Sequence, residues 1–130
     1  MEECFNISKG LGCILVQGFK TLSPSGIHQF FLRVPDAARD AGAEKVLVDG
    51  RGAEGSFSTM QQFEAGAMLA KHFKGLQVAI VVQESLRDPS QFGETVAVNR
   101  GAKVRVFTDE AEAQSWLGTN PAGDIREPLL

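Results

Sequence analysis

The most informative stretch for the fold is Lys45-Val-Leu-Val-Asp49-Gly-Arg-Gly-Ala-Glu-Gly-Ser-Phe57. Residues 45–49 form a short apolar run with a carboxylate at its end, which is typical of a strand covered on both faces. The glycines that follow predict a loop. Ser58 is then a good N-cap for a helix over residues 59–73, which ends at Gly75. The apolar stripe expected on this helix consists of Met60, Phe63, Ala67, Ala70 and Phe73.

The residues nearest the N-terminus predict an antiparallel hairpin. Lys9-Gly-Leu-Gly12 provides the glycines of a tight turn between strands at residues 5–8 and 13–18. The expected register places Cys13 opposite Ser8, and Cys4 opposite Gln17.

A long helix is expected between the hairpin and residue 45. Ser23 is its N-cap, Pro24 suits its first position and Gly42 ends it. Pro35 lies inside the helix and predicts a kink or a break near Val34. The apolar stripe of this helix consists of Ile27, Phe30, Phe31, Val34, Ala38 and Ala41.

The second half of the chain repeats the alternation of strand and helix. Residues 77–82 predict a buried strand, 90–101 a short helix, 103–107 a strand and 109–118 a final helix. The element order is therefore ββαβαβαβα, an α/β fold with a mainly parallel sheet and a hairpin at one side. Residues 119–130 show no periodicity and are expected to be an extended tail outside a single domain of residues 1–118.

Composition limits the classes of partner. The chain has 130 residues, of which 13 are Lys or Arg and 16 are Asp or Glu, for a formal charge of 13 − 16 = −3. A mildly acidic chain has no general attraction to nucleic acid or to anionic membranes. The longest apolar runs, 13–16 and 78–82, are far shorter than the roughly 20 residues of a membrane span. We therefore expect no nucleic-acid partner and no membrane span.

The cysteines and histidines provide no catalytic or metal signature. Cys4 and Cys13, with His28 and His72 far away, lack the spacing of a zinc site. Two reduced thiols and an acidic N-terminus favour a cytoplasmic protein. No nucleophile, base and orienting group converge on any motif, so we expect neither an enzyme nor a cofactor.

A family resemblance rests on five segments: Val46-Leu-Val-Asp49, Val78-Ala-Ile-Val-Val82, Val98-Asn-Arg-Gly101, Val104-Arg-Val-Phe107 and Glu110-Ala-Glu-Ala-Gln-Ser-Trp-Leu117. This pattern resembles the SpoIIAA-like proteins of the STAS superfamily, which includes anti-sigma-factor antagonists and transporter tails. The resemblance implies a mixed sheet of four or five strands with about four helices.

The resemblance also implies a place for regulation. STAS regulators usually carry a phosphoacceptor Ser or Thr at the start of the helix after the central strand. The matching residue here is Ser58, with Ser56 and Thr59 nearby, although this chain has Ser-Phe-Ser-Thr where those regulators usually have an Asp-Ser-Ser-Gly-like motif. A phosphate there would be stabilised by free backbone N–H groups and by the helix dipole. The alternative is that Ser58 only caps the helix.

Each of the other candidate residues has two interpretations. Asp49 either organises the glycine-rich loop or contacts a ligand at the carboxyl end of a parallel strand, where open α/β sheets place their sites. Arg51 is a solvated residue or part of that binding site. Phe57 either folds onto the core or is an exposed aromatic anchor for a partner. Phe30 and Phe31 share the helix stripe, and one of them could instead line a cavity or an interface.

These residues favour a non-enzymatic regulatory or protein-interaction module of the STAS type, acting through residues 49–59. The alternative is a carrier of a small apolar molecule or lipid, because the SpoIIAA-like group is also similar to CRAL-TRIO domains; this requires an apolar pocket. The partner is then a protein or a small apolar ligand, and a homodimer is also open. The expected core consists of Leu15, Phe31, Val46, Val48, Phe63, Ala79, Val81, Val96, Val104 and Trp116.

Overall fold

The computed structural model describes residues 5–10, 13–18, 24–52, 58–84 and 92–118. Within these ranges five strands and four helices follow one another in the predicted order ββαβαβαβα. The strands are β1 (Asn6–Gly10), β2 (Cys13–Gln17), β3 (Lys45–Asp49), β4 (Gln77–Val81) and β5 (Lys103–Phe107). The helices are α1 (Pro24–Ala41), α2 (Thr59–His72), α3 (Phe92–Asn99) and α4 (Glu110–Leu117). The expected tail after Gly118 lies outside the described residues.

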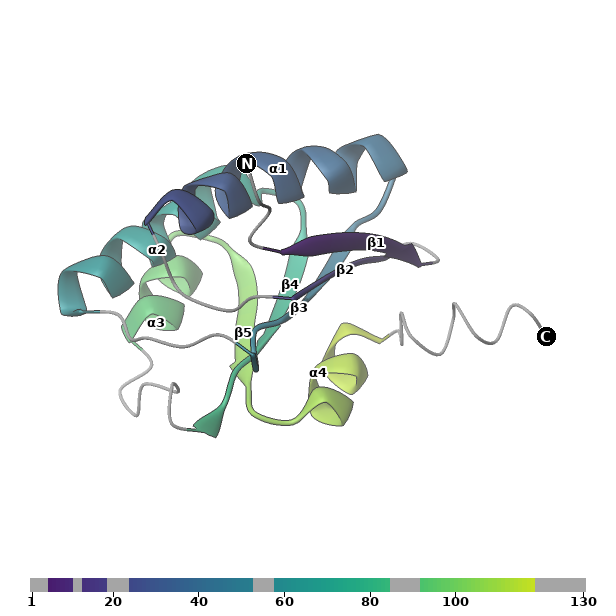
Figure 1. Cartoon of the computed structure of the whole chain (residues 1–130). Helices are drawn as coiled ribbons and strands as arrows, with labels where there is room; N and C mark the ends of the chain where they lie inside the picture. Colours follow the sequence, from purple (N-terminus) through teal and green to yellow (C-terminus); the bar gives the residue numbers. More distant parts are fainter. Residues whose placement is uncertain (1–4, 11–12, 19–23, 53–57, 85–91, 119–130) are drawn as a thin grey trace.

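All five strands form one mixed sheet in the order β1-β2-β3-β4-β5, so each strand pairs with its neighbour in the chain. The β1–β2 pair is antiparallel, and the three other pairs are parallel. Helices α1, α2 and α3 lie together on one side of the sheet, and α4 lies alone on the other (Figure 1). Right-handed crossovers place α1, α2 and α3 on one face, because the strand order never reverses and each of these helices links two parallel neighbours.

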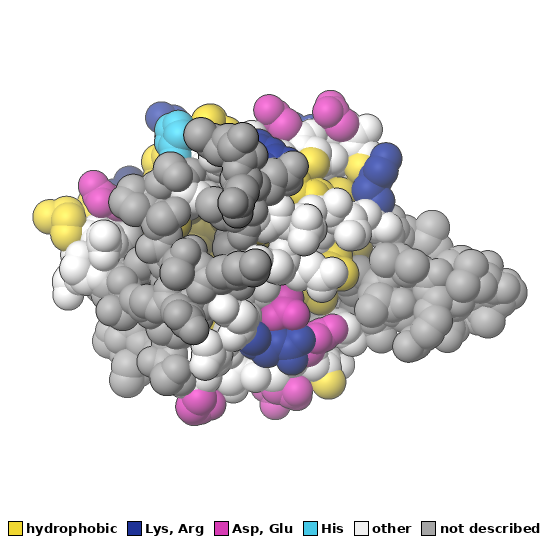
Figure 2. Space-filling view, viewed as in Figure 1, with side chains coloured by type: hydrophobic (Ala, Val, Ile, Leu, Met, Phe, Trp, Pro, Cys, Tyr) yellow, Lys and Arg dark blue, Asp and Glu magenta, His cyan; other side chains and the backbone are white. Residues whose placement is uncertain are grey.

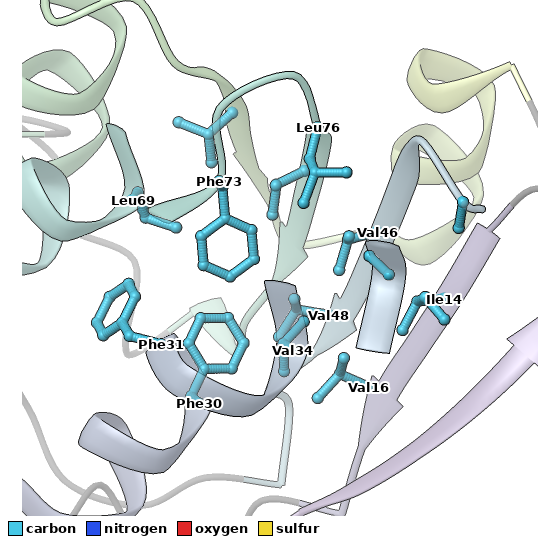
Figure 3. Packing of buried hydrophobic residues seen from close by; sticks show 14 of the residues in the cluster. Ile14, Val16, Phe30, Phe31, Val34, Val46, Val48, Leu69, Phe73 and Leu76 are labelled. Carbon is cyan, nitrogen blue, oxygen red and sulfur yellow. The ribbon is translucent and has the colours of Figure 1, made fainter. Parts of the chain in front are cut away.

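Apolar residues on the two faces of the sheet form two core clusters. Val46 and Val48 point towards α1–α3, whereas Leu47 between them points towards α4, as the two-residue period of a strand dictates. Figure 3 shows the larger cluster, in which Phe30 and Phe73 lie between the helices and the valines of the sheet. The smaller cluster consists of Cys13, Leu47, Ala79, Val81, Phe107, Ala113 and Leu117.

The hairpin forms as expected, but its predicted register was wrong by two residues. Cys13 lies opposite Gly10, and Gln17 lies opposite Asn6. Pairing continues to the Gly10–Cys13 pair, so only two residues separate the strands. A shift by an even number leaves every side chain on its own face of the sheet. For this reason the apolar pattern alone does not distinguish the two registers. Cys4 lies outside the described residues.

Helix α1 runs without a break through Pro35. A proline inside a helix costs about 3 kcal/mol. This cost is offset because Phe30, Phe31 and Val34 of the same helix are buried in the core, and each such side chain contributes about 1.5–3 kcal/mol. Packing of this stripe therefore outweighs the lost backbone hydrogen bond, and the break expected near Val34 does not occur. Gly42 has a φ of 69°, the left-handed conformation expected after a helix end.

The buried face of α2 differs from the predicted one. Met60 is 66% exposed and Phe63 is 40% exposed, so the assignment of Phe63 to the core was wrong. Of the rest of the predicted stripe, Ala70 and Phe73 are buried and Ala67 is half-buried; Gly66 and Leu69 are buried as well. The rest of the expected core is largely confirmed: Phe31, Val46, Val48, Ala79, Val81 and Val104 are buried, and Leu15, Val96 and Trp116 are half-buried.

Candidate functional site at the end of strand β3

The carboxyl end of β3 holds a network of one guanidinium and two carboxylates. Asp49 Oδ1 accepts hydrogen bonds from the backbone N–H of Arg51 at 3.1 Å and from its Nε at 2.9 Å. Asp49 Oδ2 accepts from Arg51 Nη2 at 2.8 Å, which makes the pair bidentate. The same Nη2 donates to Glu110 Oε1 at 2.6 Å. The structure thus brings together two predicted site residues, Asp49 and Arg51, with a third that was not predicted.

Glu110 comes from the first turn of α4, 59 residues after Arg51 in the chain. Its second oxygen, Oε2, accepts from Gln114 Nε2 at 2.8 Å, so both carboxylate oxygens are held. The only sequence signal for Glu110 is indirect. A helix that follows a parallel strand begins at the edge where the strands end, and this places the acidic start of α4 near Asp49. The N-cap-to-N3 spacing of Asp109 and Glu112 predicts a capping box at the start of α4, but the side chain of Asp109 makes no capping bond.

The network shifts the pKa values of both its central groups in the direction that favours their charged forms. The hydrogen bonds from Arg51 lower the pKa of Asp49 below its usual value, although partial burial acts in the opposite direction. The same interactions raise the pKa of Arg51, so its charge is permanent. The exposed fractions of the side chains are 44% for Arg51, 23% for Asp49 and 32% for Glu110. Asp49 is therefore a constant negative charge near neutral pH and a poor proton acceptor.

Gly50 holds the start of the loop close to the sheet. Its backbone N–H donates to the carbonyl of Val81 at 2.7 Å. A Cβ atom at residue 50 would lie 3.3 Å from that same carbonyl oxygen, so the close approach favours glycine. The chain thus leaves β3 still bonded to β4, and Arg51 is directed back onto Asp49. The first turn of the glycine-rich loop is accordingly ordered by backbone and side-chain bonds together.

Ser58 begins α2 with a complete capping box. Its Oγ accepts from the backbone N–H of Gln61 at 3.1 Å, and the side chain of Gln61 accepts from the backbone N–H of Ser58 at 2.8 Å. Ser58 and Thr59 are both exposed. Beside them, Phe63 of the same helix lies under the guanidinium of Arg100, 5.4 Å from the ring centre. The helix start therefore presents two hydroxyl groups, Met60 and a half-exposed aromatic ring.

The predicted aromatic candidates are not brought to this site. Phe30 and Phe31 are buried in the core between α1 and α2 (Figure 3). The Phe30 ring stacks on Phe73 at 5.4 Å and meets the edge of Phe31 at 5.2 Å, and it also packs against Phe5 at 6.2 Å. Two further candidates, Ser56 and Phe57, lie outside the described residues.

Other chemistry-bearing groups in the described residues lie apart from one another. No three His, Cys, Asp or Glu side chains in that part of the chain are arranged to hold a metal ion. His28 is exposed, and His72 lies beside the Phe31 ring, 6.3 Å between ring centres. Cys13 is fully buried beneath α4.

Comparison with protein-family models, with curated proteins and with solved structures finds no match for this chain. Within the described residues, none of the helices combines the length and the apolar character needed to cross a bilayer.

Proposed function

We propose that this protein is a regulatory or protein-interaction module of the STAS type, and that it binds its partner through the surface of residues 49–59. One observation supports this proposal above all. An ordered ionic network and the exposed start of α2 lie at the same edge of the sheet. The network fixes Asp49 and Arg51, and the capping box fixes Ser58. A partner therefore meets charged and hydroxyl groups whose positions are already set, which reduces the entropy lost on binding.

The order of strands and helices also supports this proposal. A single α/β domain with a five-stranded mixed sheet is what the resemblance to SpoIIAA-like proteins implies. In that resemblance Ser58 matches the phosphoacceptor position. A phosphate on its exposed Oγ would lie at the N-terminus of α2, where backbone N–H groups favour negative charge.

The carrier alternative receives less support from the described residues. It needs a pocket lined by Phe30, Phe31, Phe57 and Met60. Phe30 and Phe31 instead pack on each other and on Phe73 within the core, and Met60 is 66% exposed to solvent. Two of the four lining residues are thus used for folding and a third faces outward. We therefore favour a protein partner over a small apolar ligand.

The test is site-specific photocrosslinking of the partner in native lysate. A benzophenone side chain replaces Met60 in one variant and Leu32 in a control variant, because Leu32 is similarly exposed, at 50%, but lies on α1. We expect a specific adduct from residue 60 that excess wild-type protein removes by competition. Excess Ser58→Asp or Phe57→Ala protein should compete several-fold less well. Aspartate caps a helix as well as serine does, so the first change alters charge and leaves the cap in place.

Equal adducts from residues 32 and 60 would refute the assignment of the surface. A small molecule found with the purified protein in native mass spectrometry, together with no adduct from residue 60, would favour the carrier instead.

A further inference from the structure

Negative charge is concentrated where the parallel strands end. We define the carboxyl edge as the described residues 17–18, 49–52, 58–61, 82–84 and 107–112, which contain the ends of β2, β3 and β5, the residues that follow β4, and the starts of α2 and α4. In Figure 2 a Lys or Arg side chain lies among acidic ones in the lower part of the molecule, and further acidic side chains follow the lower rim. Five acids and one base give this edge a formal charge of 1 − 5 = −4: Asp49, Glu84, Asp109, Glu110, Glu112 and Arg51.

The opposite edge of the sheet carries the opposite charge. We define the amino edge as residues 39–45, 71–77, 99–103 and 116–118, which contain the ends of all four helices and the starts of β3–β5. Six bases and two acids give it a formal charge of 6 − 2 = +4: Arg39, Lys45, Lys71, Lys74, Arg100, Lys103, Asp40 and Glu44. All of these side chains except that of Lys45 belong to exposed residues, and Lys45 is half-buried.

Helix dipoles oppose this separation, because a helix N-terminus carries a partial positive charge and a helix C-terminus a partial negative one. All four helices begin at the carboxyl edge, and each helix end carries a partial charge of about half a unit, or about two units per edge. These partial charges are opposite in sign to the formal charge of four units at each edge, so they offset about half of it. A strand of five residues separates the two edges by about 16 Å, which exceeds the screening length of about 10 Å at 0.1 M salt, so at that salt the edges act as separate charges. Each edge therefore keeps a net charge that a partner can meet.

We propose that copies of this chain associate head to tail, with the amino edge of one copy on the carboxyl edge of the next. The partner at each edge is a second copy of this chain, because both halves of the interface are present in one chain. Their formal charges are equal in magnitude and opposite in sign. Such a contact joins two different surfaces, so every copy keeps one free edge of each kind and the assembly grows into an open chain or closes into a ring. The proposal does not rest on the proposed function, since it needs neither Ser58 nor a second kind of protein.

The experiment is sedimentation velocity of the full chain over a range of concentrations and salt. Wild-type protein should form larger species as concentration rises at low ionic strength. These species should dissociate near 1 M salt, where the screening length falls to about 3 Å. Lys74→Glu at the amino edge, and Glu112→Lys at the carboxyl edge, should each weaken self-association by about threefold or more.

Mixing the two variants distinguishes this geometry from a symmetric dimer. Each variant keeps one intact edge, so an equimolar mixture should form a one-to-one complex more readily than either variant associates with itself. Arg105→Glu is the matched control, because it gives the same net charge as Lys74→Glu, −3 − 2 = −5, from an exposed residue midway along β5. It should associate like the wild type.

Three results would overturn the proposal. They are a wild-type protein that stays monomeric at low salt, an Arg105→Glu variant as weak as Lys74→Glu, and a mixture that behaves as the sum of its parts. Circular dichroism of every variant shows whether a loss of association comes from a loss of folding.

Discussion

The sharpest prediction concerns Arg51, whose removal should lower stability in a pH-dependent way. Replacing Arg51 by Met keeps much of the apolar stem but removes both ion pairs, with Asp49 and with Glu110. Exposed ion pairs are worth about 0.2–1 kcal/mol each, and a bidentate pair lies at the upper end of that range. We therefore expect a loss of about 1–2 kcal/mol at pH 7. At about 2.1 cal/mol/K per residue, this corresponds to a fall in melting temperature of about 4–7 °C.

The pH dependence identifies the cause of this loss. In the wild type, Arg51 lowers the pKa of Asp49 in the folded state. The stabilisation is therefore present above the unfolded pKa of about 3.9, and it is lost as the pH falls through the still lower folded value. In Arg51→Met the side-chain hydrogen bonds and the positive charge are lost, whereas burial, which raises the pKa of Asp49, and the backbone N–H of residue 51, which lowers it, both remain. The pKa of Asp49 in the folded variant should therefore lie above that in the folded wild type. The stabilities of the two proteins should accordingly draw together as the pH falls below the unfolded pKa of about 3.9 and through the folded pKa of Asp49.

The assay is urea denaturation of wild type and Arg51→Met between pH 7 and pH 3, followed by circular dichroism. Lys74→Met is the control, because it removes the same positive charge as Arg51→Met but from an exposed residue in the turn after α2. Its effect on the free energy of unfolding should be small and should not depend on Asp49. If Arg51→Met differs from the wild type by the same amount at pH 3 as at pH 7, the ionic network does not contribute as described.

Three further changes test the fold. Ser58→Ala should cost about 1 kcal/mol in urea denaturation, whereas Ser58→Asp should cost little, because aspartate also accepts from the N–H of Gln61; equal losses would contradict the capping box. Val81→Asp should abolish the cooperative thermal transition, because an unpaired carboxylate at a fully buried residue of β4 costs several kcal/mol against a total stability of about 5–15 kcal/mol; an unchanged melt would show that this strand does not lie in the core. Truncation after Gly118 should leave the melting temperature within a few degrees, and a large fall would mean that the tail packs onto the domain.

The elements of the fold could be predicted because local signals agree with one another. Continuous apolar runs mark β3 and β4, and a capping serine and a terminal glycine mark the limits of α2. What could not be predicted depends on geometry between elements. The hairpin registers differ by two residues and bury the same faces. The exposure of Phe63 depends on how α2 packs against neighbouring elements, which its periodicity does not encode.

In the candidate site, too, local signals could be predicted from the sequence and contacts between elements could not. Asp49 follows from a general rule about the carboxyl ends of parallel strands. Ser58 follows from helix capping and from the family resemblance. The link from Arg51 to Glu110 spans 59 residues, and it exists only because α4 begins at the edge where β3 ends. A motif search along the chain cannot find such a pair, because its members are far apart in the sequence. The strand order brings the end of β3 and the start of α4 to the same edge of the sheet.

Because the strands pair in chain order, the sheet can be assembled one unit at a time as the chain leaves the ribosome. Paired residues at the starts of neighbouring parallel strands are separated by 45 − 13 = 32, 77 − 45 = 32 and 103 − 77 = 26 residues, so no step has to close a much longer loop than another. Helices α1–α3 cover their face as each crossover is completed. The other face, with Leu47 and Ala79, stays uncovered until α4 has been synthesised, near the end of the described chain. A nascent or truncated chain that lacks residues 110–117 therefore exposes a flat apolar surface, and α4 is the element whose late arrival decides between native closure and aggregation.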